Sequence, residues 1–238
     1  MIRSLIIAVA VAMPTLSNAQ ALEVQPVTDN VWALVGEKEQ RSPENLANNA
    51  TFGLIVTTQG AVLVDPGGSW KGAEALQTAI QTLTDQPVVY VINTGGQDHR
   101  WIGNSYWQAQ GATVIASEAA VEDQRSRGSL QLTALRTLLG DALEGTEPSY
   151  ADVTFTEEYV LELGDLSIEI RHSGPAHTPG DSFVWVPSRT TVFTGDIVYV
   201  ERILGVGDQS SITQFEQVLL GKGDVGVGRF SAFQRIAQ

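Results

Sequence analysis

The chain has 238 residues, a net charge of −13 and no cysteine. The missing cysteines exclude disulfides, thiolate metal ligands and a cysteine nucleophile, and the negative charge argues against nucleic acid and anionic membranes as partners. The length suits one domain with a sizeable core.

The N-terminal segment has the pattern of an export signal. Arg3 supplies positive charge, Leu5–Met13 is an apolar run, and a small-residue cleavage site ends at Ala19. A transmembrane anchor is disfavoured because the run is too short to cross a bilayer and Pro14 interrupts it. We therefore expect a signal peptide over residues 1–19 and a mature protein that is periplasmic or secreted, with no stable membrane insertion after cleavage.

The first half of the mature chain is predicted to alternate strands with helices. The expected strands are Val31–Gly36, Phe52–Thr57, Ala61–Asp65, Val88–Asn93 and Thr113–Ala116. The expected helices are Trp70–Leu83, Ile102–Gln110 and, within Ser117–Leu139, two helices joined near Gly128. Residues 140–149 read as a loop.

The second half is predicted to begin again as strands. These are Val153–Phe155, Tyr159–Leu163, Leu166–Arg171, Phe183–Val186 and Thr190–Phe193. A β-rich half, helices and a second β-rich half favour two sheets packed face to face with helices outside. The expected fold class is therefore α/β, as an αββα four-layer sandwich.

Three segments carry side chains that bind metals, and each follows a predicted strand. They are the pair Asp98-His99, the loop residue His177, and Asp196. Loops that leave the same end of a sheet converge, so these residues are expected to share one site. Two imidazoles and two carboxylates form a mixed nitrogen and oxygen donor set that suits zinc, iron or manganese.

Each candidate also has a purely structural explanation. Asp98 can cap the helix that follows it, His177 can be a hydrogen-bonded loop residue, and Asp196 can belong to a turn. Five further residues are candidates for supporting the metal ligands or touching substrate. They are Asp65, Gln97, Arg100, Trp101 (a core residue in the alternative reading) and His172 (a replacement ligand or a packed histidine).

At this point the chain resembles the metallo-β-lactamase superfamily from about residue 31 to residue 196. The matching features stand in the family order: Val-Leu-Val-Asp65, Asp98-His99 after a strand, His177 in a glycine–proline loop, and Thr194-Gly195-Asp196. Within the superfamily the motifs look most like those of exported SoxH-like and quinoprotein-relay zinc metallohydrolases. The resemblance implies a hydrolase domain over residues 20–238.

The chain departs from the family pattern at the first metal. The family loop reads H-x-H-x-D-H, and Thr94 and Gly96 stand at its first two histidine positions. The resemblance leaves His177 from the first site, and Asp98, His99 and the bridging Asp196 from the second. The last strand, the final ligand histidine and the terminal helix are expected to be missing, either by truncation or by a change of reading frame within residues 221–229.

The resemblance implies a metal-dependent hydrolase that holds one zinc ion rather than two, with iron or manganese as alternatives. Asp98, His99, His177 and Asp196 would hold the ion, and Asp98 or Asp196 would act as general base. The small-molecule substrate would carry an ester, thioester, lactam or similar bond. Two alternatives remain open: a degenerate protein that binds a small molecule or a partner without turnover, and a fragment without function.

Overall fold

The computed structural model describes residues 22–199 and 206–211 of the chain. The expected signal peptide and the expected changes near the C-terminus lie outside these residues. The described part of the chain contains no helix long and apolar enough to cross a bilayer.

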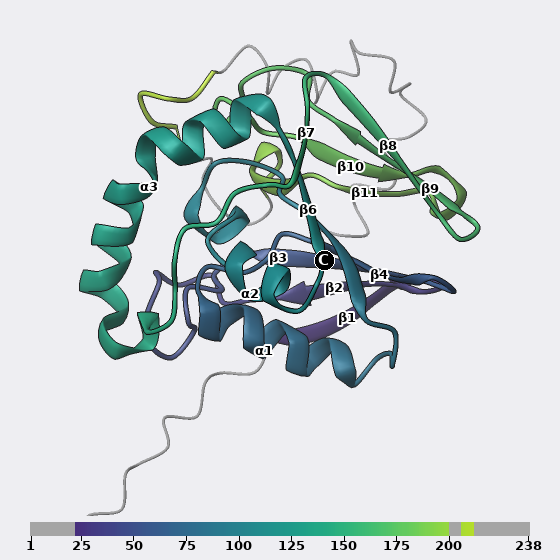
Figure 1. The fold of residues 1–238 in the computed structure, drawn as a ribbon, viewed down its shortest axis with the longest axis horizontal. Coiled ribbons are helices and arrows are strands. Elements are labelled where there is room, and N and C mark those ends of the chain that lie inside the picture. The colour runs from purple at the N-terminus through teal and green to yellow at the C-terminus, as the bar shows by residue number, and fades with distance from the viewer. Residues whose placement is uncertain (1–21, 200–205, 212–238) are drawn as a thin grey trace, which may run out of the picture.

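Two β-sheets face each other in the molecule (Figure 1). The first has seven strands in sequence order: β1 Glu23–Thr28, β2 Val31–Val35, β3 Thr51–Thr57, β4 Gly60–Val64, β5 Val88–Ile92, β6 Thr113–Ser117 and β7 Val153–Phe155. Its first four strands are antiparallel, and β4 to β7 run parallel. The second sheet is antiparallel in the order β11 Thr191–Phe193, β10 Phe183–Val186, β9 Leu166–Arg171 and β8 Glu158–Leu163.

The main core lies between the two sheets. Val62 and Ile92 from the first sheet pack with Ile168 and Val184 from the second, and all four are at most 1% exposed. Strand β9 alternates buried and half-buried residues, the pattern of a strand with one face on a core. The described chain is thus a mixed α/β sandwich of two sheets and helices, which confirms the predicted fold class.

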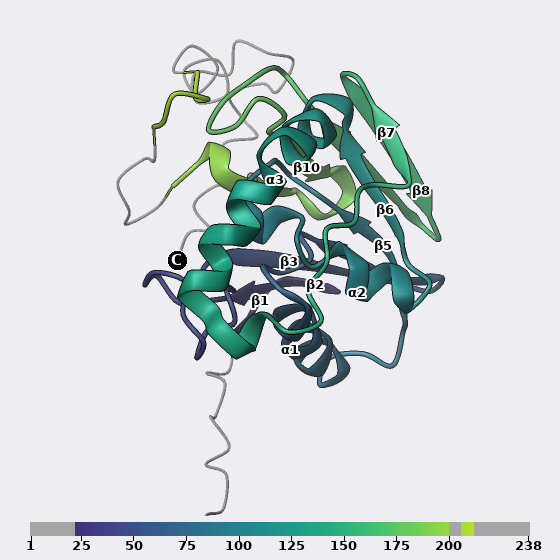
Figure 2. The same cartoon turned by 60° about the vertical axis from the view of Figure 1, so that its left-hand side comes forward.

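Helices α1 (Trp70–Gln81) and α2 (Asn104–Ala109) cover the outer face of the seven-stranded sheet (Figure 1). Ser69 begins α1 by accepting a hydrogen bond from the backbone of Gly72, as N-cap serines do. Leu76 and Ile80 are buried against the sheet. Figure 2 shows the long helix α3 (Glu118–Leu139) running along one side of the sandwich.

The prediction of two helices joined near Gly128 was wrong, because α3 is continuous through that residue. A Cβ atom at Gly128 would lie 3.0 Å from the indole of Trp101, so the glycine serves close packing and does not end a helix. Two short 3-10 helices, Gly140–Leu143 and Asp98–Arg100, lie in segments that were expected to be loops.

The strand arrangement also differs from expectation in two places. Strand β7 was expected to open the second sheet, but it pairs in parallel with β6 at the edge of the first. Strand β1 was not predicted. Its residues are half-buried or exposed and include Pro26, and a sequence with a proline and a weak apolar pattern gives little sign of an edge strand.

Candidate functional site

The site forms where strands β4, β5 and β11 end. Asp65 directly follows β4, and its carboxylate accepts hydrogen bonds from the backbone N–H of Thr94, at 2.8 Å, and from the Thr94 hydroxyl. Thr94 lies in the loop after β5, which continues into the short 3-10 helix of Asp98, His99 and Arg100. Asp196 lies in a second 3-10 helix after β11. Strand ends therefore bring these residues together, as expected.

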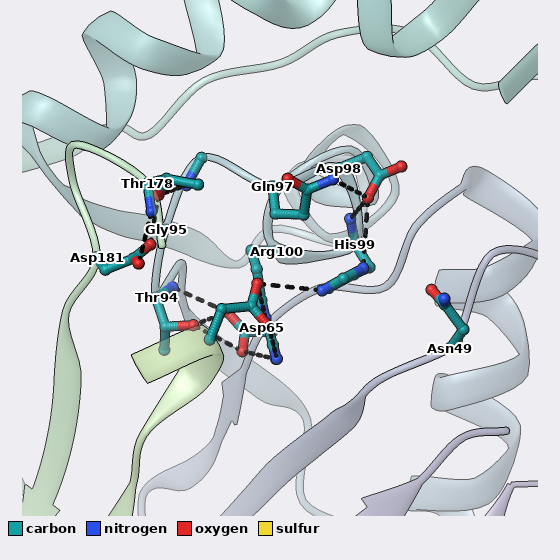
Figure 3. A network of polar contacts seen from close by, with 12 residues as sticks. Asn49, Asp65, Thr94, Gly95, Gln97, Asp98, His99, Arg100, Thr178 and Asp181 are labelled. Carbon is teal, nitrogen blue, oxygen red and sulfur yellow. Dashed lines mark hydrogen bonds and ion pairs between the residues drawn. The ribbon is translucent and has the colours of Figure 1, made fainter. Parts of the chain in front are cut away.

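His99 lies between two carboxylates, and Figure 3 shows it beside that of Asp98. Its Nε2 atom is 3.3 Å from Asp196 Oδ2, and its Nδ1 atom is 3.3 Å from Asp98 Oδ1. Asp98, His99 and Asp196 are all at most 7% exposed. Three of the four predicted metal ligands are thus neighbours in a buried polar cluster.

Arg41 reaches this cluster from the loop between β2 and β3. Its Nε donates to Asp98 Oδ2 at 2.6 Å, and its Nη2 contacts the other oxygen of the same carboxylate. The same Nη2 lies 3.0 Å from Nδ1 of His99. A guanidinium held on both oxygens of a carboxylate is the geometry that gives strong, specific ion pairs.

Arg100 plays the matching role for Asp196. Its Nη2 donates to Asp196 Oδ1 at 2.9 Å, and its Nη1 donates to Asp65 Oδ2 at 2.6 Å. Nη1 also donates to the backbone carbonyl of Thr51. Arg100 was a candidate either for supporting the metal ligands or for touching substrate, and in the structure it joins two buried carboxylates within the fold.

These contacts decide which groups stay charged. Burial by itself raises the pKa of Asp98, but the imidazole of His99 and the charge of Arg41 outweigh it and hold that pKa well below its usual range. For Asp196, burial is likewise outweighed by Arg100 and His99, so its pKa is also lowered. Asp98 and Asp196 are therefore carboxylates at neutral pH.

Asp181 behaves in the opposite way. Its burial, and then the negative charge of Asp196, raise its pKa to about 7. The Thr178 hydroxyl and backbone N–H donate to its carboxylate, and Figure 3 shows the pair beside Gly95. Sequence reasoning missed Asp181, although it closes the glycine–proline loop that carries His177.

The two remaining histidines make other contacts: His172 contacts the loop backbone and His177 contacts an aromatic ring. The His172 ring donates through Nδ1 to the backbone carbonyl of Asp181 at 2.8 Å, the structural role named as the alternative to ligation. The His177 ring packs edge-on against Tyr199, with 6.1 Å between ring centroids. Tyr199 in turn is hydrogen-bonded to Asp196, and burial together with that carboxylate raises the pKa of the phenol.

Helix α3 packs against Gly95 and Gly96, and Gly96 is one of the two positions where the resemblance leads us to expect a histidine. A Cβ atom on Gly96 would overlap the carboxylate of Asp123, which is paired with Arg127. Gln124 and Gln131 donate to the backbone carbonyls of the same glycine loop, at 3.1 Å and 2.8 Å. A histidine has no room at position 96 in this arrangement.

The last two predicted residues support the loop. Gln97 donates to Asp98 Oδ1 at 3.3 Å. Trp101 is fully buried, donates through its indole N–H to Gln131 and stacks on Tyr150 at 5.5 Å. Trp101 is therefore a core residue, the second of its two readings.

The described donors do not fit a bound metal ion as they stand. No group of three histidine, aspartate or glutamate side chains within residues 22–199 and 206–211 is arranged to hold an ion. The two nitrogens of His99 point in opposite directions, one toward Asp98 and one toward Asp196, so one ion cannot bind the ring and both carboxylates. Arg41 and Arg100 also supply the positive charge that a metal would bring.

Comparison with known proteins identifies the fold family. The family model described as the metallo-beta-lactamase superfamily matches residues 47–225. A metallo-beta-lactamase from Pontibacter korlensis is similar in structure at a TM-score of 0.63 and 24% identity, covering 84% of this chain and 86% of that one. The DIM-1 metallo-beta-lactamase exposed to ceftazidime has a TM-score of 0.65 at 18% identity, and the match covers 90% of this chain and 86% of that one. The IND-7 metallo-beta-lactamase has a TM-score of 0.63 at 16% identity, and the match covers 91% of this chain and 87% of that one.

At these identities the structural matches show the fold alone, whereas the family model matches well over half of the chain. Members of this family are generally metal-dependent hydrolases that bind divalent metals, commonly zinc. The narrower resemblance to SoxH-like enzymes stays a prediction. The chain belongs to the metallo-β-lactamase superfamily.

Proposed function

We propose that this chain is an exported hydrolase that cleaves an ester, thioester, lactam or similar bond in a small molecule. Its family membership supports the hydrolase class. The observation that carries the proposal to this site is the contact of Asp98, His99 and Asp196 at the strand ends, at 3.3 Å on each side of the imidazole. The signal-like N-terminal sequence supports export to the periplasm or beyond.

The two carboxylates are the groups that can take a proton from an attacking water. Both have lowered pKa values and are ionised at neutral pH. A carboxylate held at such a low pKa is a weak base, because general base catalysis works best when the pKa lies near the working pH. The described arrangement is therefore a resting one, in which Arg41 has to release Asp98 before that carboxylate can accept a proton.

A second candidate function is binding without turnover. It is favoured because the polar atoms of the site already have partners within the protein. Arg41 contacts both oxygens of Asp98, and Arg100 contacts both oxygens of Asp196. Both nitrogens of His99 face a carboxylate. A protein that keeps this arrangement throughout its working life has no free base for hydrolysis.

One experiment separates the two candidates. The full chain is exported, purified and assayed with an aryl ester, a thioester and a β-lactam, with metal content measured by elemental analysis before and after chelation. We expect Asp98→Asn to lower kcat/KM by a hundredfold or more, since it removes a candidate base (a general base contributes about 10²–10⁴-fold). Asp123→Asn is the matched control, because Asp123 is also a buried aspartate paired with an arginine.

Hydrolysis that survives Asp98→Asn unchanged would rule out the assigned role of this carboxylate. A folded wild-type chain that hydrolyses none of the three bond types, with or without added zinc, would favour binding without turnover.

A further inference from the structure

The two arginines of the site differ in how firmly the fold holds them. Arg100 is 6% exposed in its side chain and is bound to two carboxylates and a backbone carbonyl. The side chain of Arg41 is 15% exposed, and besides Asp98 and His99 it contacts the neighbouring, exposed Gln40. Arg100 is thus part of the framework, and Arg41 approaches from the rim.

The loop that carries Arg41 is well fixed, so the position of the guanidinium is a property of the fold. Asn45 accepts from the backbone N–H of Ser42 at 2.9 Å and donates to the carbonyl of Gln40 at 2.9 Å. These bonds hold the backbone on both sides of Arg41. Only the side chain of Arg41 has to rotate for Asp98 to be released.

The contacts of Arg41 coincide with the donor atoms of two predicted metal ligands. It covers both oxygens of Asp98 and Nδ1 of His99. A divalent cation at this point would use the same lone pairs, and it would be repelled by a guanidinium within 3.0 Å of the imidazole. The guanidinium and a metal ion therefore exclude each other.

We infer that Arg41 is a built-in cation that competes with divalent metals for Asp98 and His99, so that the site binds a metal only when Arg41 is displaced. This inference deepens the proposed function, since it names the residue that controls the same site. Its test is a binding measurement, which does not depend on whether any bond is hydrolysed.

The competition has a predictable size. When a ligand binds only the open form of a site, its apparent dissociation constant is the intrinsic constant divided by the open fraction. If Arg41 covers the site nine-tenths of the time or more, its removal strengthens metal binding by about tenfold or more. The effect requires no change in the metal ligands themselves.

The experiment titrates the chelator-treated full chain with cobalt(II), whose visible spectrum reports histidine and carboxylate ligation, and with zinc in competition. We expect Arg41→Gln to bind cobalt about tenfold or more tightly than the wild type. Arg41→Lys should fall between them, because a lysine keeps the charge but cannot cover both oxygens of Asp98. His99→Ala added to Arg41→Gln should abolish the gain.

Arg189→Gln is the matched control, since Arg189 is also an arginine paired with an aspartate, and it lies in the turn between β10 and β11. It should bind cobalt as the wild type does. The inference is overturned if the wild type is purified with a full equivalent of metal, or if folded Arg41→Gln binds cobalt no more tightly than Arg189→Gln. Should Arg41→Gln fail to fold, Arg41→Lys decides the question by the same comparison. If Arg41→Gln binds cobalt more tightly as expected but the wild type hydrolyses no substrate, the proposed activity is contradicted and the inference about Arg41 stands.

Discussion

Replacing Arg100 with methionine tests whether this side chain holds the site together. Methionine approximates the length of the arginine stem but removes its charge and its donors. The change leaves the carboxylates of Asp65 and Asp196 buried, at 1% and 7% exposure, without their shared cation. It also removes the donor to the carbonyl of Thr51.

The expected loss is large. Removing one partner of a buried ion pair costs about 3–5 kcal/mol, because the other charge stays buried and uncompensated. Domains of ordinary stability unfold with about 5–15 kcal/mol, so Arg100→Met should retain a marginal fold at best. A partly exposed ion pair contributes only about 0–1 kcal/mol. We therefore expect a loss in that range when the partly exposed Arg171 is replaced as a control.

The pH dependence of the loss gives a second check. The folded-state pKa of Asp196 is lowered, so its contribution is present above the unfolded value of 3.8 and is lost as the pH falls through the folded value. Without Arg100, burial raises that pKa, and the folded state takes up a proton more readily than the unfolded state. The difference in stability between variant and wild type should therefore be largest at pH 7 and should narrow toward pH 4.

The assay is urea unfolding followed by tryptophan fluorescence, on wild type, Arg100→Met and the control Arg171→Met, whose arginine side chain is 25% exposed. The reasoning is refuted if Arg100→Met loses less than about 1 kcal/mol at pH 7, the range of an exposed pair. A loss that does not vary between pH 4 and pH 7 would likewise contradict the assigned charge state of Asp196.

The remaining predictions concern the loop and its surroundings. Gly96→Ala should cost about 1–3 kcal/mol in urea unfolding, because its methyl group overlaps the Asp123 carboxylate. The double variant Gly96→Ala, Asp123→Ala should lose less free energy of unfolding than the sum of the two single losses. Strictly additive losses would show that the new methyl group and the Asp123 carboxylate do not collide. The pKa of Asp181 is raised from 3.8 to about 7 in the folded chain. Its contribution to the free energy of unfolding is therefore fully present below pH 3.8 and is lost as the pH rises toward 7, by up to about 1.4 kcal/mol per pH unit. Thermal unfolding between pH 5 and pH 8 should show that this part of the pH dependence disappears in Asp181→Asn, and an unchanged profile would contradict it.

Much of the fold follows from local patterns in the sequence. Strand β9 alternates core and surface residues over Leu166–Arg171, and α1 begins directly after the N-cap Ser69, so both were predicted closely. Local patterns failed where packing decided the outcome. Gly128 looks like a helix break in sequence, but the structure uses its missing side chain to seat Trp101 against a continuous helix.

The sequence by itself determined that Asp98, His99 and Asp196 follow strands, because β-branched runs and the residues that end them are local signals. Only the tertiary structure decided which cations these residues face. Arg41 lies 57 positions before Asp98 in the chain, in a polar loop that carries no motif. The pairing of buried charges depends on the distance between them in the folded chain and on their desolvation, and neither can be read from local sequence patterns.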